Sequence, residues 1–74
     1  MDEKIIALVK PEYFDKIPHM FRKHATEATC GLIAREYPDL YAAFEHEPSA
    51  SEVEEMTRIV NGVFEERMGK HHML

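Results

Sequence analysis

The chain has 74 residues, a formal charge of −5 and a single cysteine, Cys30. This length fits one domain at most, one cysteine excludes a disulfide scaffold, and no apolar run approaches the roughly 18 to 20 residues that span a bilayer. The longest apolar run, residues 5 to 9, is also too short for the core of a signal peptide. We therefore expect one small cytoplasmic domain over residues 1–74.

The net charge comes from the second half of the chain. Residues 1 to 37 carry six acidic and six basic residues, whereas residues 38 to 74 carry eight acidic residues against Arg58, Arg67 and Lys70. Nucleic acids and anionic membranes both bind basic faces, so an acidic chain is poorly suited to either. The charge instead favours a protein partner with a basic surface.

The N-terminal segment fits either a short helix or a buried strand. One face of a helix would carry Ile5, Leu8 and Val9. A single strand finds no pairing partner in this chain unless it pairs across a dimer or with a hairpin, so we expect a helix. Pro11 then suits the first turn of another short helix. An apolar cluster follows it, formed by Tyr13, Phe14 and Ile17.

Residues 19 to 37 predict a longer helix. Its apolar stripe is narrow and consists of Phe21, Ala25, Ala28 and Leu32. The opposite side is also partly apolar, with Cys30, Ile33 and Tyr37. We therefore expect this helix to be contacted on two sides.

A short helix is expected after Pro38, because proline interrupts the preceding helix. Asp39 is a candidate cap for its first turn, and the segment would end near Glu47. Its apolar edge consists of Leu40, Tyr41 and Phe44.

The clearest pattern predicts a helix over residues 51 to 69. Ser51 and Glu54 have the spacing of a capping box, and Ser49 and Glu52 have the same spacing two residues earlier. About half of the helix circumference is apolar, with Val53, Met56, Ile59, Val60, Val63, Phe64 and Met68. We expect residues 70 to 74 to form a flexible tail.

One dipeptide in this helix, Asn61-Gly62, is typical of a two-residue β-hairpin turn. A hairpin requires alternating apolar and polar residues on both sides of the turn, yet apolar pairs flank this dipeptide. A helix gathers both pairs on one side and leaves Gly62 on the polar side, at a cost of about 1 kcal/mol relative to alanine. The helix is therefore the favoured interpretation.

These elements predict an all-α fold, a small bundle of three to four short helices that ends in one long amphipathic helix. A chain this short, without a disulfide or a metal site, gains only a few kcal/mol from its own core. The wide apolar stripe of the last helix therefore suggests a homodimer. The expected self-association residues are Val53, Met56, Val60, Val63 and Phe64.

The residues that carry chemistry do not form a recognisable catalytic or metal site. A zinc site needs about three or four close ligands, whereas His19 and His24 fall on different sides of a helix, and His71 and His72 form a weak pair. Cys30 has no activating base three or four residues away, and the glycines are too isolated to cradle a phosphate. We expect no metal, no cofactor and no enzymatic activity.

The acidic side of the last helix is the candidate protein-binding surface. It comprises Glu54, Glu55, Arg58, Glu65 and Glu66. Such a negative strip steers a chain toward a basic protein surface. We expect a small regulatory protein, of the accessory or phage-inhibitor type, that binds another protein through an acidic or apolar helix face and modulates or inhibits it.

Two alternatives belong to other functional classes. A dimeric, helix-turn-helix-like DNA-binding regulator would use Arg22 and Lys23, but no second helix with exposed basic residues flanks this pair. A self-assembling structural subunit would have a second copy of itself as its only partner. The acidic net charge argues against the first alternative, and the second requires a closed oligomer without another ligand.

Overall fold

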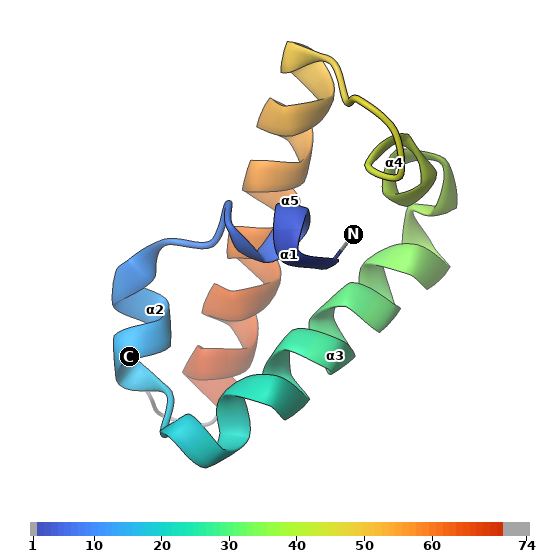
Figure 1. The fold of residues 1–74 in the computed structure, drawn as a ribbon. Helices are drawn as coiled ribbons and strands as arrows, with labels where there is room; N and C mark the ends of the chain where they lie inside the picture. The colour runs from blue at the N-terminus through green and yellow to red at the C-terminus, as the bar shows by residue number, and fades with distance from the viewer. Residues whose placement is uncertain (1, 71–74) are drawn as a thin grey trace.

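A computed structural model describes residues 2–70 of the chain. Within this range the chain is all-α, and the prediction of a helical fold that ends in one long helix is confirmed (Figure 1). Its elements are α1 (Asp2–Ile6), α2 (Pro11–Lys16), α3 (His19–Glu36), α4 (Pro38–Ala43) and α5 (Ala50–Lys70). Lys70 belongs to α5, while residues 71–74 of the expected tail lie outside the described residues. Dimerisation stays a prediction.

The N-terminal segment is helical, as the sequence favours. The chain leaves α1 through a turn in which the amides of Leu8 and Val9 donate to carbonyls three residues back, at 3.1 and 3.0 Å. α2 then begins with Pro11 in its first turn, where the missing N–H has no helical partner to lose. Both segments are anchored by buried apolar side chains, which are Ile5, Val9, Tyr13 and Ile17.

Asn61 lies inside α5 and is buried, so the hairpin interpretation is excluded. Its Oδ1 accepts a hydrogen bond from the Lys10 amide at 2.9 Å, and its Nδ2 donates to the Leu8 carbonyl at 3.0 Å. Nδ2 also donates to the Thr57 carbonyl at 2.8 Å, one turn back in the same helix. The side-chain amide thus satisfies backbone groups of the α1–α2 connection that lack a helical partner.

The start of α5 is fixed by one of the two expected capping boxes. The Ser49 amide donates to Glu52 Oε1 at 2.8 Å, and the Glu52 amide donates to the Ser49 hydroxyl at 3.2 Å. Ser51, the alternative cap, shares a hydrogen bond with the Ser49 hydroxyl at 3.2 Å. α5 therefore starts one residue before the predicted boundary, and it ends one residue after it.

The buried side of α3 differs from the expected one. The residues that the helix buries are Thr29, Cys30 and Ile33. The predicted apolar stripe, in contrast, is half-buried along most of its length and exposed at Phe21. Three of its members, Phe21, Ala25 and Leu32, line surface depressions beside α5. The stripe therefore belongs to the surface rather than to the core, and the expected contact on two sides of this helix stays a prediction.

α4 is shorter than expected, and Asp39 is not its cap. Pro38 occupies the first helical turn, Tyr37 holds the N-cap position without a side-chain hydrogen bond, and Asp39 lies inside the first turn. The helix ends at Ala43, and Phe44 follows it as a buried core residue. Proline displaces the cap because it is favoured at the first helical position, next to the N-cap.

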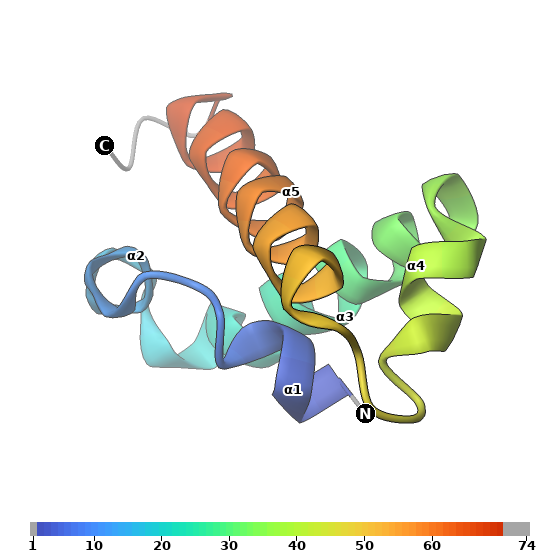
Figure 2. The same ribbon diagram turned by 90° about the horizontal axis from the view of Figure 1, so that it is seen from above.

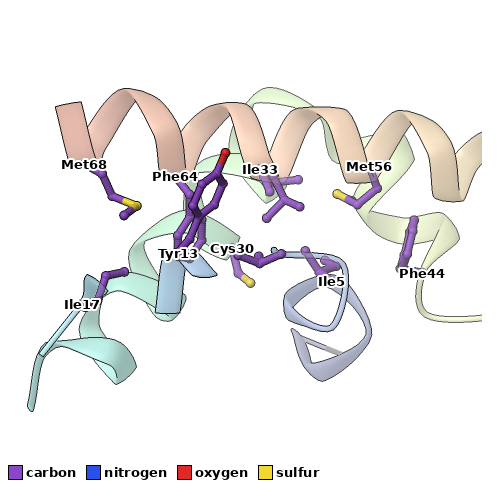
Figure 3. Packing of buried hydrophobic residues seen from close by; sticks show 11 residues of the cluster. Ile5, Tyr13, Ile17, Cys30, Ile33, Phe44, Met56, Phe64 and Met68 are labelled. Carbon is purple, nitrogen blue, oxygen red and sulfur yellow. The ribbon is translucent and has the colours of Figure 1, made fainter. Parts of the chain in front are cut away.

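The core lies where α5 crosses the other helices. Figure 2 shows α5 in the middle of the molecule, with α2 and α4 on opposite sides of it. Met56, Phe64 and Met68 project from one side of α5 toward α1, α2 and α3 (Figure 3). The complete set of buried apolar residues in the described range is Ile5, Val9, Tyr13, Ile17, Cys30, Ile33, Phe44, Met56, Val60, Phe64 and Met68. α5 is therefore the central element of the core.

Candidate functional site

The structure places all of the predicted protein-binding residues at the surface of α5. The exposed set is Glu54, Glu55, Arg58, Glu65 and Glu66. The first three lie in the first half of the helix, and the two last glutamates lie about two turns further on. These two neighbours have different surroundings, because successive helical residues point about 100° apart.

Glu65 makes a hydrogen bond within the molecule. The Tyr13 hydroxyl of α2 donates a hydrogen bond to Glu65 Oε1. Figure 3 shows the Tyr13 ring among the core residues with its hydroxyl directed toward α5. The hydrogen bond to Glu65, together with burial of the ring, raises the pKa of Tyr13 to about 12. This glutamate therefore holds α2 against α5.

Glu66 instead borders a depression between α3 and α5, which we call the acidic groove. The groove has a volume of about 740 Å³ and is lined by Leu32, Glu36, Tyr37, Ile59, Gly62, Val63 and Glu66. Its floor consists of half-buried apolar side chains, and the only charged lining residues in the described part of the chain are two glutamates. Glu66 Oε1 lies 3.4 Å from Lys70 Nζ, in a pair whose two side chains are exposed.

The predicted self-association residues are divided by the fold. Met56, Val60 and Phe64 are buried in the core of their own chain, so in this fold they offer no surface to a second copy. Val53 and Val63 are half-buried, and Val63 lines the acidic groove. Much of the apolar stripe thus packs inside the chain, and a dimer would need a surface other than these three core residues.

A second depression, which we call the basic pocket, lies between the first half of α3 and the end of α5. It has a volume of about 410 Å³ and is lined by Ile17, Phe21, His24, Ala25, Thr29, Phe64, Arg67 and Met68. Among residues 2–70, the lining contains no acidic side chain. Phe21, at its edge, is 52% exposed. Sequence reasoning missed this site, although Phe21 and Ala25 of the predicted stripe were its signal.

Arg22, one of the two candidate DNA-binding residues near this pocket, interacts with other residues of its own chain. Arg22 Nε donates to the Ile17 carbonyl at 3.0 Å. Arg22 Nη1 also lies 3.4 and 3.3 Å from the two ring nitrogens of His19. Arg22 is half-buried and stabilises the corner between α2 and α3, whereas Lys23 is exposed.

Other kinds of site receive no support from the described part of the chain. Among residues 2–70, no group of three or more potential ligands is placed to hold a metal ion. Cys30 is buried, as is typical of a cysteine that packs in a core. No helix in the same range is long and apolar enough to cross a membrane. Comparisons with protein-family models, curated proteins and solved structures found no match for this chain.

Proposed function

We propose that the chain is a small non-enzymatic regulatory protein that binds a basic, amphipathic segment of another protein in the acidic groove. The observation that carries this proposal is the arrangement of the groove, in which an apolar floor lies between Glu36 and Glu66 without a basic lining residue. A segment with apolar residues on one side and lysine or arginine at its edges complements both features.

The groove has the properties of a protein-binding surface at its centre as well as at its edge. Ile59 and Val63 are half-buried, so a partner completes their burial rather than covering isolated exposed residues. Tyr37 at the groove is 44% exposed and adds an aromatic ring, a residue type enriched among those that dominate binding energy. Burial of these side chains supplies affinity, and the carboxylates supply orientation.

The ion pair at the edge of the groove does not oppose binding. Glu66 and Lys70 are both exposed, and such surface pairs contribute only about 0 to 1 kcal/mol. A lysine or arginine of the partner can therefore replace Lys70 at little cost. Glu54 and Glu55, near the start of α5, extend the negative potential that attracts such a partner.

The same charges disfavour a symmetric dimer through this groove. In a two-fold symmetric contact each copy would bring its own Glu36 and Glu66 to a shared interface. Like charges brought together in an interface cost binding energy. The groove therefore fits a basic partner better than a second copy of the chain.

The test uses two glycines of α5 as a matched pair. Gly62 lines the groove and Gly69 does not, both are exposed, and an added Cβ at either meets no atom within 4 Å. Partners that co-purify with the chain from its own cells are identified and their affinity is measured for Gly62→Gln and Gly69→Gln. We expect Gly62→Gln to weaken binding at least about tenfold, a loss of about 1.4 kcal/mol, and Gly69→Gln to leave it unchanged.

Equal binding by the two glycine variants would contradict the proposal. A second pair tests the charge, because Glu66 borders the groove and Glu54 does not. Glu66→Gln is expected to weaken binding more than Glu54→Gln, and the difference should shrink in high salt. If none of the four substitutions changes the affinity of a partner, that partner binds to another surface of the chain.

A further inference from the structure

The basic pocket has the size and lining of a site for a small molecule. Its volume of about 410 Å³ falls in the range of about 300 to 1,000 Å³ that is typical of ligand pockets. Five of the lining residues are apolar, and they come from the α2–α3 corner, from α3 and from α5. Phe64 and Met68 are core residues, so the floor of the pocket is part of the packed interior.

The ionisable side chains among the described residues of the pocket lining are basic, and Thr29 adds a neutral hydroxyl. Arg67 and His24 line the pocket, and none of the lining residues that the structure describes is acidic, although the whole chain carries a formal charge of −5. Arg67 forms no ion pair with any other residue of the described range 2–70. Its guanidinium is therefore available to an anion, and arginine binds carboxylates through two parallel hydrogen bonds.

We propose that the basic pocket binds a small apolar carboxylate, such as a medium-chain fatty acid. The hydrocarbon body lies against Phe21, Ala25 and Phe64, and the carboxylate pairs with Arg67 at the edge, beside His24. Phe21 is 52% exposed, which leaves ring area for a hydrocarbon body to cover. This site is separate from the acidic groove, and the proposal does not depend on the function proposed for that groove.

The experiment compares three ligands that share one hydrocarbon chain. Decanoate is the anion, 1-decanol lacks the charge, and decyltrimethylammonium has the opposite charge. Each is titrated below its micelle concentration into the isotope-labelled chain, and amide shifts are followed by nuclear magnetic resonance. We expect decanoate to bind saturably, to shift the amides of residues 21–29 and 64–68, and to bind about tenfold more tightly than the alcohol, as one charge-assisted interaction implies.

Two arginine variants assign the charge to the pocket. Arg67→Gln removes the guanidinium at the edge, whereas Arg35→Gln removes an exposed arginine of α3 that lines neither depression. The first is expected to make decanoate and decanol bind equally, and the second to leave the preference intact. Gly62→Gln in the acidic groove should leave decanoate binding unchanged. The two proposals can therefore be refuted independently of each other.

Filling the pocket tests its position without altering charge. Ala25 is half-buried at the pocket wall, and Ala25→Leu is expected to weaken decanoate and decanol alike. If that variant does not fold, the arginine pair still decides the matter. Equal affinity for decanoate and decanol, an unchanged preference in Arg67→Gln, or shifts confined to other residues would each overturn the proposal.

Discussion

The acidic groove and the basic pocket both lie between α3 and α5, yet they differ in charge and in how far their apolar lining residues are buried. Val63 and Glu66 line the groove, while their neighbours Phe64 and Arg67 line the pocket. A step of about 100° along a helix is enough to assign adjacent residues to different surfaces. One amphipathic helix can therefore serve two sites of opposite charge within a single small domain.

The two sites also relate differently to the core. The floor of the basic pocket includes Phe64 and Met68, which are almost completely buried, whereas Ile59 and Val63 in the acidic groove are half-buried. Substitutions in the groove should therefore report on binding with little loss of stability. Substitutions at the floor of the pocket should affect the stability of the whole fold.

The largest expected effect is a difference in unfolding free energy between variants of two adjacent residues. Phe64→Ala removes a buried ring that lies 5.5 Å from the Phe14 ring, centroid to centroid, and should cost about 3 to 5 kcal/mol of unfolding free energy. Val63→Ala removes two half-exposed methyl groups and should cost about 1 kcal/mol or less. Urea unfolding followed by circular dichroism measures both. Similar losses for the two variants would contradict the contrast between groove and pocket.

A smaller effect is expected at Asn61, the buried polar residue of α5. Asn61→Ala leaves the Lys10 amide and the Leu8 carbonyl without their partner and should cost about 1 to 3 kcal/mol. The loss should be accompanied by faster hydrogen exchange of the Lys10 amide, because the α1–α2 connection is released. Unchanged exchange at Lys10 would mean that packing rather than this hydrogen bond holds the connection.

The last prediction concerns a loss of stability that develops only in alkali. The pKa of Tyr13 is raised from 10.0 to about 12, first by its hydrogen bond to Glu65 and then by burial. The folded state thus retains a proton that the unfolded chain loses more easily. The stabilisation is complete below pH 10 and is lost as the pH rises from 10 to 12. Tyr13→Phe should lack this decline, while Tyr37→Phe, which changes an exposed tyrosine, should retain it.

Unfolding free energies measured across this pH range compare the two tyrosine variants directly. Equal declines in both would show that Glu65 does not retain the Tyr13 proton in the folded state. The result also concerns the acidic groove, because the hydrogen bond to Tyr13 assigns Glu65 to holding α2 against α5. It leaves the adjacent Glu66 as the α5 glutamate that borders the acidic groove.

The candidate sites were only partly predictable. The sequence indicated an acidic surface on the last helix, and Glu66 does border a groove. It did not indicate that Glu36 and Tyr37, at the end of α3, help to line that groove, or that Arg67 and His24 line the same pocket. These pairs lie on helices that are separate in sequence. Only the way in which α3 and α5 pack brings them together.

The sequence by itself determined the helices and, to within one residue, the ends of α3 and α5. The Ser49–Glu52 capping box, Pro11 and Pro38 at first turns, and the apolar period of the last helix all act over a few residues, so local rules identify them. Asn61-Gly62 was the test of these rules, and the surrounding apolar pattern outweighed the turn signal.

Only the tertiary structure decided which faces became core and which became sites. Asn61 bonds to Lys10 and Leu8, 51 and 53 residues away, and Glu65 bonds to Tyr13, 52 residues away. Such contacts depend on the path of the chain and on the crossing of packed helices, which no local pattern encodes. For the same reason the apolar stripe of α3 faces the two depressions, while Thr29, Cys30 and Ile33 are buried.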